Sequence, residues 1–310
     1  MMRRSLTLSL LGGCLAVLPG LLSVAAVEVA RPGAAGPGIP PIVSAEWLAG
    51  RLQDPALVVL DARAGLRDYL ASHIPGAQSL GVENLRSSAA GVPGQVFPVE
   101  VLSIVARRLG IRRDSRVVVY GAETDPDATF VAGVLRLAGL GGVSILDGGF
   151  KRWSQEGRPT TAERRAVSES GLRLKDPAAG IASLEDMRRA LKDSGPVLVD
   201  ARPAEQYEAG HLPGAVSRFW KDDLVPEGQA GAGGMRDVAG LEAEYRALGI
   251  TKDRPVIVYC NTGHTASEVF YTLRYRLGYP DVRLYDGSWV EWTLYPDLPR
   301  DTGPSRAPER

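Results

Sequence analysis

The chain has 310 residues, with 36 basic and 36 acidic side chains and a formal net charge of zero. This length is enough for about two domains of ~100–200 residues, each able to bury a core of its own. Balanced charge argues against a nucleic-acid-binding protein, because neutralising phosphates requires an excess of lysine and arginine.

The first 26 residues have the composition of a cleaved signal peptide. Two arginines precede an apolar stretch that ends in small residues, with Val24 and Ala26 at the −3 and −1 positions of a signal-peptidase site. We therefore expect a periplasmic or otherwise secreted protein with no stable membrane insertion after processing. Sec and twin-arginine export both remain open. Lipoprotein anchoring at Cys14 is disfavoured, because apolar sequence continues well past it.

Beyond this segment the pattern predicts two α/β domains, because short β-branched runs alternate with helical stretches as in a mainly parallel sheet flanked by helices. Ser44 is the predicted N-cap of the first helix, and Ser183 and Asp186 have the spacing of a capping box. The predicted segments are a signal peptide (1–26), a linker (27–41), domain 1 (42–158), an interdomain linker (159–180), domain 2 (181–298) and a disordered tail (299–310).

The two domains carry the same four signatures at a constant spacing of 138 or 139 residues, which indicates a duplication. At the third signature, the first copy has Gly121 where the second has Cys260. Removal of the signal peptide leaves Cys260 as the sole cysteine. The signatures are VVLDAR and VLVDAR (58–63, 197–202), HIPGA and HLPGA (73–77, 211–215), VVVYG and VIVYC (117–121, 256–260), and DGGFKRW and DGSWVEW (147–153, 286–292).

Cys260 lies between a predicted buried strand and a predicted helix, in a short loop read NTGHTA. Such a loop can turn several backbone N–H groups toward one point, and the helix end adds a partial positive charge. Both effects favour a nucleophilic thiolate. The equivalent loop of the first copy has no thiol, and it carries the acidic residues Glu123, Asp125 and Asp127. Domain 1 is therefore predicted to be inactive and to wall the cleft.

Two other kinds of site are disfavoured. Phosphatase-type cysteine loops place an arginine six residues after the cysteine, and here that residue is Ala266. A zinc site is excluded by the lack of metal-ligand spacing among one cysteine and three scattered histidines. We expect no metal and no cofactor.

Together, the paired signatures resemble those of the tandem-domain rhodanese family of sulfurtransferases, in its bacterial exported form, over roughly residues 42–297. The resemblance implies two rhodanese-like domains, the first inactive. It also implies transfer of a sulfane sulfur from a small anionic donor to a thiophilic acceptor, such as cyanide or a thiol, through a persulfide. A thiol or a sulfur-accepting protein is the implied partner.

The resemblance also implies roles for individual residues. Cys260 matches the persulfide-forming cysteine, Arg202 the arginine that pairs with the donor, and Asp200 a supporting residue. The remaining predicted substrate-binding residues form the loop: Asn261, Thr262, Gly263, His264 and Thr265. Three residues are interpreted as structural because each has a counterpart in the other copy: His211 of the second signature, and Trp153 and Trp292 of the fourth. Trp220 has no aromatic counterpart and is a candidate residue lining the cleft.

The donor is left open by the loop sequence. Thiosulfate enzymes of the vertebrate type have a basic residue two positions after the cysteine. Here that position is Thr262, a hydroxyl residue as in mercaptopyruvate enzymes, while His264 resembles some bacterial thiosulfate enzymes. We expect thiosulfate as the donor, with 3-mercaptopyruvate sulfurtransferase and a non-enzymatic persulfide carrier as alternatives.

Overall fold

The computed structural model describes residues 39–192 and 195–304. The predicted signal peptide, the linker before residue 39 and the last six residues of the predicted tail lie outside these ranges. Within them, no helix is both long and apolar enough to cross a membrane.

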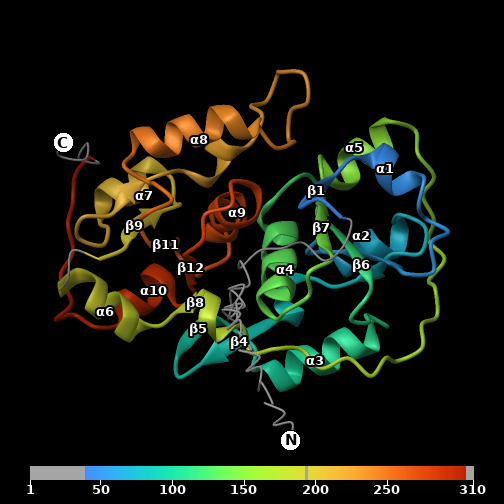
Figure 1. The fold of residues 1–310 in the computed structure, drawn as a ribbon, viewed down its shortest axis with the longest axis horizontal. Coiled ribbons are helices and arrows are strands. Elements are labelled where there is room, and N and C mark those ends of the chain that lie inside the picture. Colours follow the sequence, from blue (N-terminus) through green and yellow to red (C-terminus); the bar gives the residue numbers. More distant parts are fainter. Residues whose placement is uncertain (1–38, 193–194, 305–310) are drawn as a thin grey trace, which may run out of the picture. The chain divides into compact units, whose positions relative to one another are not determined.

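The first half is built on a parallel sheet of five strands in the order β1-β7-β6-β2-β3 (Figure 1). Helices flank it, and Ser44 caps the first of them by accepting the Trp47 N–H at 3.1 Å. The strands of the sheet are β1 (Ile42–Val43), β2 (Leu57–Asp61), β3 (Gln78–Ser79), β6 (Arg116–Tyr120) and β7 (Val143–Leu146), and the helices are α1 (Ala45–Ala49), α2 (Leu66–Ala71), η1 (Val82–Asn84), α3 (Val99–Arg108), α4 (Pro126–Leu137) and α5 (Gly149–Gln155).

The second half repeats this sheet in the order β10-β9-β11-β12-β8, which is the first order read from the other end. The predicted capping box opens α6, where Ser183 and Asp186 exchange hydrogen bonds. The strands are β8 (Ile181–Ala182), β9 (Val197–Asp200), β10 (Val216–Ser217), β11 (Val256–Tyr259) and β12 (Val282–Tyr285), and the helices are η2 (Pro177–Gly180), α6 (Leu184–Lys192), α7 (Ala204–Ala209), η3 (Trp220–Asp223), α8 (Val238–Ala247), α9 (Ala266–Tyr271), the π-helical η4 (Thr272–Arg276) and α10 (Ser288–Thr293). The prediction of two α/β domains with parallel sheets is confirmed.

An antiparallel hairpin of β4 (Arg86–Ala89) and β5 (Val92–Val96) projects from the first half and was not predicted. It reaches the second half, where the Val96 N–H donates to Asp286 Oδ2 at 2.7 Å. A hydrogen bond in the opposite direction also joins the halves: the Met235 N–H of the second half donates to Asp147 Oδ1 of the first at 2.9 Å. Asp147 and Asp286 open the fourth signature in their respective copies, so each half covers the equivalent loop of the other.

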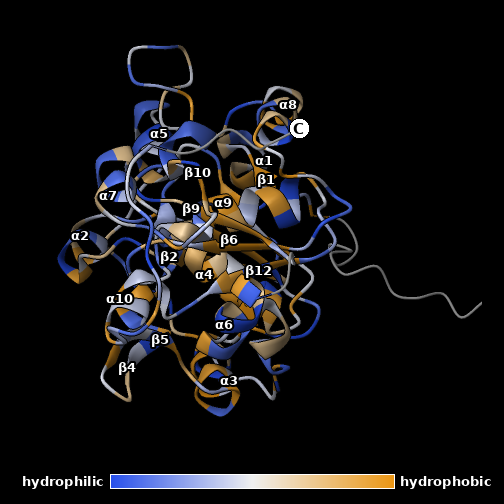
Figure 2. Ribbon diagram, turned by 90° about the vertical axis from the view of Figure 1, so that its left-hand side faces the viewer, coloured by the Kyte–Doolittle hydropathy of each residue, from blue (hydrophilic) through white to orange (hydrophobic). Residues whose placement is uncertain are grey.

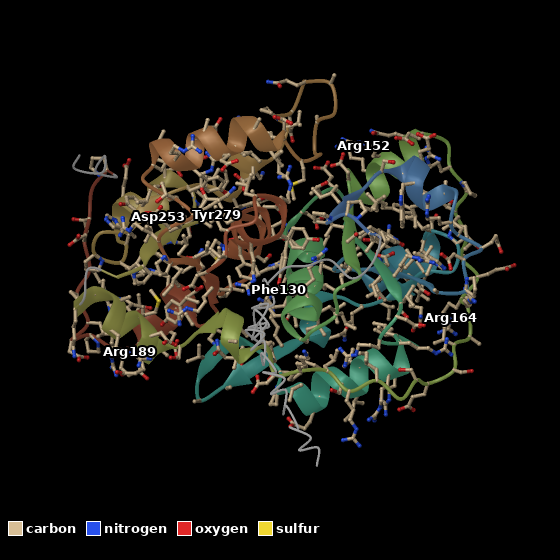
Figure 3. The ribbon with its side chains drawn as sticks, viewed as in Figure 1. Phe130, Arg152, Arg164, Arg189, Asp253 and Tyr279 are labelled. Atoms are coloured by element: carbon tan, nitrogen blue, oxygen red, sulfur yellow. The ribbon has the colours of Figure 1, made fainter. Side chains whose placement is uncertain are left out.

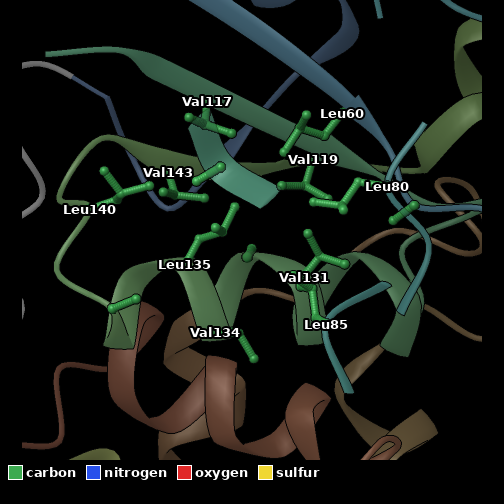
Figure 4. Packing of buried hydrophobic residues seen from close by; sticks show 14 of the residues in the cluster. Leu60, Leu80, Leu85, Val117, Val119, Val131, Val134, Leu135, Leu140 and Val143 are labelled. Atoms are coloured by element: carbon green, nitrogen blue, oxygen red, sulfur yellow. The ribbon is translucent and has the colours of Figure 1, made fainter. Parts of the chain in front are cut away.

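The two halves meet where α4 packs against α9 (Figure 1). On its other face α4 packs under the first sheet, and Figure 4 shows its Val131 and Leu135 pointing toward valines of β6 and β7. The most hydrophobic colours in Figure 2 accordingly fall on elements such as β6, α4 and α9. Polar groups also cross this interface: Thr129 Oγ1 and Ser267 Oγ are hydrogen-bonded at 2.9 Å, both fully buried.

The structure differs from the predicted boundaries at both ends. The tail predicted to be disordered is anchored over its first residues, because the backbone of Asp301 exchanges hydrogen bonds with that of His211. The predicted linker likewise joins domain 1 at its end: Ile39 is buried, and the Pro41 carbonyl accepts the Ile145 N–H. These backbone pairings link distant segments, so a polar, Pro-rich composition did not reveal them.

Candidate active site

Cys260 lies at the carboxyl end of β11, the central strand of the second sheet. Its N–H donates to Ser288 Oγ at 3.2 Å, and its carbonyl accepts the Trp289 N–H at 3.0 Å. The residue is only 1% exposed. The backbone of the cysteine is therefore fixed between β11 and α10, and its side chain is almost wholly covered.

The backbone N–H groups of residues 261–265 make no hydrogen bond within the described part of the chain. They follow one another around the turn from Cys260 into α9. Unpaired donors are rare in a folded protein, and those at the start of a helix carry partial positive charge. Five such donors in one turn can bind an anion.

The equivalent loop of the first half receives its own anion. The Asp125 carboxylate accepts the N–H groups of Ala122, Glu123 and Ala128, at 2.9, 3.3 and 3.2 Å. A Cβ built on Gly121 would overlap this carboxylate. Asp125 thus fills the position that a thiol side chain would need. The other two acidic residues predicted to repel an anion lie elsewhere: Glu123 pairs with Lys151, and Asp127 contacts the second half.

Two residues with left-handed backbone conformations shape the cysteine loop. Gly263 has φ of 74°, and a Cβ there would lie 2.7 Å from the Asp286 carbonyl oxygen. Ser288 has φ of 51°, an unfavourable value for a residue with a side chain. Its hydroxyl accepts the Cys260 N–H and donates to the Tyr285 carbonyl. Sequence reasoning missed Ser288, although the change from DGG to DGS between the copies was a signal for it.

Neighbouring residues position the loop side chains. Asn261 Nδ2 donates to Gln206 Oε1 at 2.8 Å. Thr262 lies against the hairpin of the first half: a Cβ on Gly94 would sit 3.3 Å from the Thr262 carbonyl oxygen and 3.7 Å from its Cβ. The first half therefore walls the loop, as expected from the duplication.

Arg202 was predicted to bind the donor, and in the structure its donors are directed to neighbouring groups of its own half. Its side chain is 3% exposed, and its Nε and Nη2 donate to the Asp200 carboxylate and the Gly210 carbonyl. Its guanidinium also lies 4.6 Å from the Trp289 ring centroid. Arg63 makes the same bonds to Asp61 and a carbonyl in the inactive half. A pair kept in both copies positions the end of its strand, and Asp200 is the partner that holds Arg202 there.

His264 does not turn its side chain toward an open donor site. Its Nε2 lies 2.9 Å from Asp127 Oδ1 of the first half, and its ring meets the edge of the Phe130 ring at 5.9 Å. The imidazole therefore joins the two halves, while the backbone N–H of His264 stays part of the loop. Because Asp127 and Phe130 come from the other domain, the sequence around His264 did not show this.

The remaining residues repeat between the copies. His211 Nδ1 lies 2.8 Å from the Tyr207 carbonyl, and His73 makes the same contact with Tyr69. Trp153 and Trp292 are fully buried. Trp220 packs against the hydrophobic cluster that contains Cys260.

One titratable carboxyl group lies beside the cysteine loop. Burial raises the pKa of Asp286 to about 6, and Glu291 adds to the rise, while the Val96 N–H and Arg86 oppose it. Asp286 Oδ1 has no hydrogen-bond partner among the described residues. Because this pKa lies below 7, the carboxyl group is mostly ionised at neutral pH and adds negative charge near the loop.

Comparisons with known proteins agree with this geometry. The family model "Rhodanese-like domain" matches twice, over residues 44–156 and 183–295. The chain is 30% identical to the 3-mercaptopyruvate sulfurtransferase of Escherichia coli (83% of this chain, 96% of that protein) and 30% identical to the thiosulfate sulfurtransferase of Corynebacterium glutamicum (84% and 90%). It is 31% identical to the sulfur carrier protein TtuD of Thermus thermophilus (81% and 93%). The crystal structure of SseA from Escherichia coli superposes with a TM-score of 0.73 at 29% identity, covering 81% of this chain and 99% of that one.

Proposed function

Because this chain belongs to the rhodanese family of sulfurtransferases and carries two of its domains, we propose that it moves sulfane sulfur from thiosulfate to a thiophilic acceptor through a persulfide on Cys260. The acceptor is cyanide, a small thiol or a thiol of a protein. The second half carries the reaction, and the first half closes the site.

The proposed reaction has two steps of nucleophilic displacement. The Cys260 thiolate attacks the outer sulfur of thiosulfate, the S–S bond of the donor breaks, and sulfite leaves with the bonding electron pair. The enzyme then holds a persulfide anion. An acceptor such as cyanide attacks the terminal sulfur of that persulfide, so that thiocyanate forms and the Cys260 thiolate is restored. Neither step needs a metal, a redox cofactor or an added proton.

The observation that carries this proposal is the row of N–H groups over residues 261–265, which have no hydrogen-bond partner in the described part of the chain. Both the departing sulfite and the persulfide carry negative charge, so donors fixed around the sulfur stabilise them without reorganising during the reaction. The first half supports the assignment, since the same kind of loop there is neutralised by the Asp125 carboxylate.

The main alternative donor is 3-mercaptopyruvate, and one observation favours it. Thr262 supplies a hydroxyl where thiosulfate enzymes of the vertebrate type carry a basic residue. A persulfide carrier without turnover is the second alternative, suggested by the similarity to a sulfur carrier protein. We favour thiosulfate because its two negative charges use more of the free N–H groups than a single carboxylate does.

Intact-mass spectrometry after incubation with thiosulfate tests the proposal. Wild-type protein should gain one sulfur, about 32 Da, and lose it again on addition of cyanide with release of thiocyanate. The Cys260→Ser variant should gain nothing. Sulfur uptake by that variant would refute a Cys260 persulfide. Uptake from mercaptopyruvate but not from thiosulfate would assign the donor to the alternative, and uptake without turnover would indicate a carrier.

A further inference from the structure

Neither second-half position at which the family resemblance leads one to look for a cation, Arg202 or Thr262, offers an open charge to the cysteine loop. Arg202 is committed to Asp200 and Gly210, and Thr262 has no charge. A dianionic donor bound to N–H groups alone would also face the Asp286 carboxylate. The charge that such a donor needs must therefore come from outside the loop, and the hairpin of the first half lies against it.

Arg86, the first residue of β4, brings a guanidinium to this position. A Cβ on Gly94 would lie 3.3 Å from Arg86 Nη1 and equally 3.3 Å from the Thr262 carbonyl oxygen, so the guanidinium and the cysteine loop approach the same point of the hairpin. Gly94 has φ of 77°, which allows this tight approach. Arg86 also lies 5.5 Å from the ring centroid of Phe130 (labelled in Figure 3), the ring that meets His264.

One donor of Arg86 is unused. Nη1 is shut off from solvent and has no hydrogen-bond partner among the residues that the structure describes. The Nε and Nη2 donors bind Glu83, a side chain that is 76% exposed. Ion pairs with so exposed a partner contribute little, whereas a buried guanidinium donor without a partner is costly. The arrangement leaves Nη1 for an anion that the closed site would hold.

Comparison of the two copies shows that Arg86 does not simply neutralise an aspartate. In the first half, Asp147 forms a direct ion pair with Arg152 of α5. At the position equivalent to Arg152 the second half has Glu291, and Arg86 makes no direct ion pair with Asp286. The positive charge of Arg86 therefore lowers the pKa of Asp286 through space. Its Nη1 donor does not bind that carboxylate.

We propose that Arg86 of the catalytically inactive half binds the anionic end of the sulfur donor, so that the first half supplies the cation that the cysteine loop lacks at Thr262. This inference rests on the proposed function. Arg86 is then a determinant of donor affinity and charge selectivity, and it acts on binding rather than on the sulfur-transfer step itself. Thiosulfate, with two negative charges, depends on it more than mercaptopyruvate, with one carboxylate.

Steady-state kinetics of Arg86→Gln and Arg86→Lys test this. Arg86→Gln should raise the KM for thiosulfate at least about tenfold, the effect of losing one charge-assisted hydrogen bond, with kcat within about twofold. The KM for mercaptopyruvate should rise less. Arg86→Lys should recover part of the affinity, because it keeps the charge but not the planar fork. The matched control Arg108→Ala removes an exposed arginine of the same half and should change neither constant.

Two further measurements separate binding from folding. Calorimetric titration of thiosulfate into Cys260→Ser and into Cys260→Ser/Arg86→Gln should show the same loss of affinity without any turnover. Glu83→Gln removes the exposed partner of Arg86 but keeps the guanidinium. This variant should not raise the KM for thiosulfate, and it can be measured even if Arg86→Gln unfolds.

A thiosulfate KM within twofold of wild type in Arg86→Gln, or a raised KM in Glu83→Gln, would overturn the role of Arg86. A wild-type protein that takes no sulfur from thiosulfate would instead overturn the proposed function.

Discussion

Glu268, the third residue of α9, is a carboxyl group fully buried between the two halves. Its two oxygens have no hydrogen-bond partner in the described chain. Burial raises its pKa to about 8, and Asp223 and Asp125 add to the rise, whereas Arg276 opposes it. We predict that Glu268→Gln removes the largest single carboxyl contribution to the pH dependence of stability between about pH 5 and 8.

The magnitude follows from the two protonation equilibria. The pKa of this carboxyl group is 4.5 as the reference and about 8 in the fold. The folded state therefore binds the proton more tightly, and stability falls as pH rises from the first value to the second. At about 1.4 kcal/mol per pH unit the loss is at most about 5 kcal/mol. Below pH 4.5 the carboxyl is protonated in both states, so wild type and variant should be equally stable there.

Equilibrium urea unfolding at intervals from pH 4.5 to 9 measures this difference. The free energy of unfolding of wild type should fall relative to Glu268→Gln with rising pH, and the gap should stop growing above about pH 8. Burial also raises the pKa values of Asp125 and Asp286 to about 6. Subtracting the two curves removes their contributions, because both groups titrate in both proteins. The control Glu100→Gln changes an exposed carboxyl and should follow wild type. Parallel curves for wild type and Glu268→Gln would refute the assignment of a raised pKa to Glu268.

Three further predictions concern the loop of the first half, the arginines Arg63 and Arg202, and the predicted signal peptide. Gly121→Cys should take up no second sulfur by intact mass, because Asp125 fills the loop, and uptake of two sulfurs per chain would contradict this. Arg202→Ala and Arg63→Ala should each lower the free energy of urea unfolding by about 3–5 kcal/mol, because each leaves a buried aspartate unpaired. A loss confined to activity in Arg202→Ala would restore its predicted role in donor binding. We propose export with removal of the leader, so N-terminal sequencing of the exported protein should begin near Val27, and an unprocessed cytoplasmic chain would exclude it.

The sequence by itself determined the duplication and most of the elements that short segments specify. Four signatures at one spacing showed the duplication, and β-branched runs between helical stretches predicted both parallel sheets, because strand and helix periodicity are properties of short segments. The Ser44 cap and the position of Cys260 between a strand and a helix followed from neighbouring residues in the same way. The contrast between Gly121 and Cys260 predicted that the second half is the one that reacts.

Only the tertiary structure decided which side chains meet at the site. Arg202 follows its strand as predicted, but burial against Asp200 closes it off, and the same pair in the inactive half shows that this is a feature of the fold. The contacts of His264 with Asp127 and of Thr262 with the hairpin join positions more than a hundred residues apart. Such contacts depend on how two folded halves dock, and a periodic pattern specifies which face of an element is buried but not what covers it. For that reason Arg86, which no motif marked, emerged as a candidate only when the hairpin and the cysteine loop were seen together.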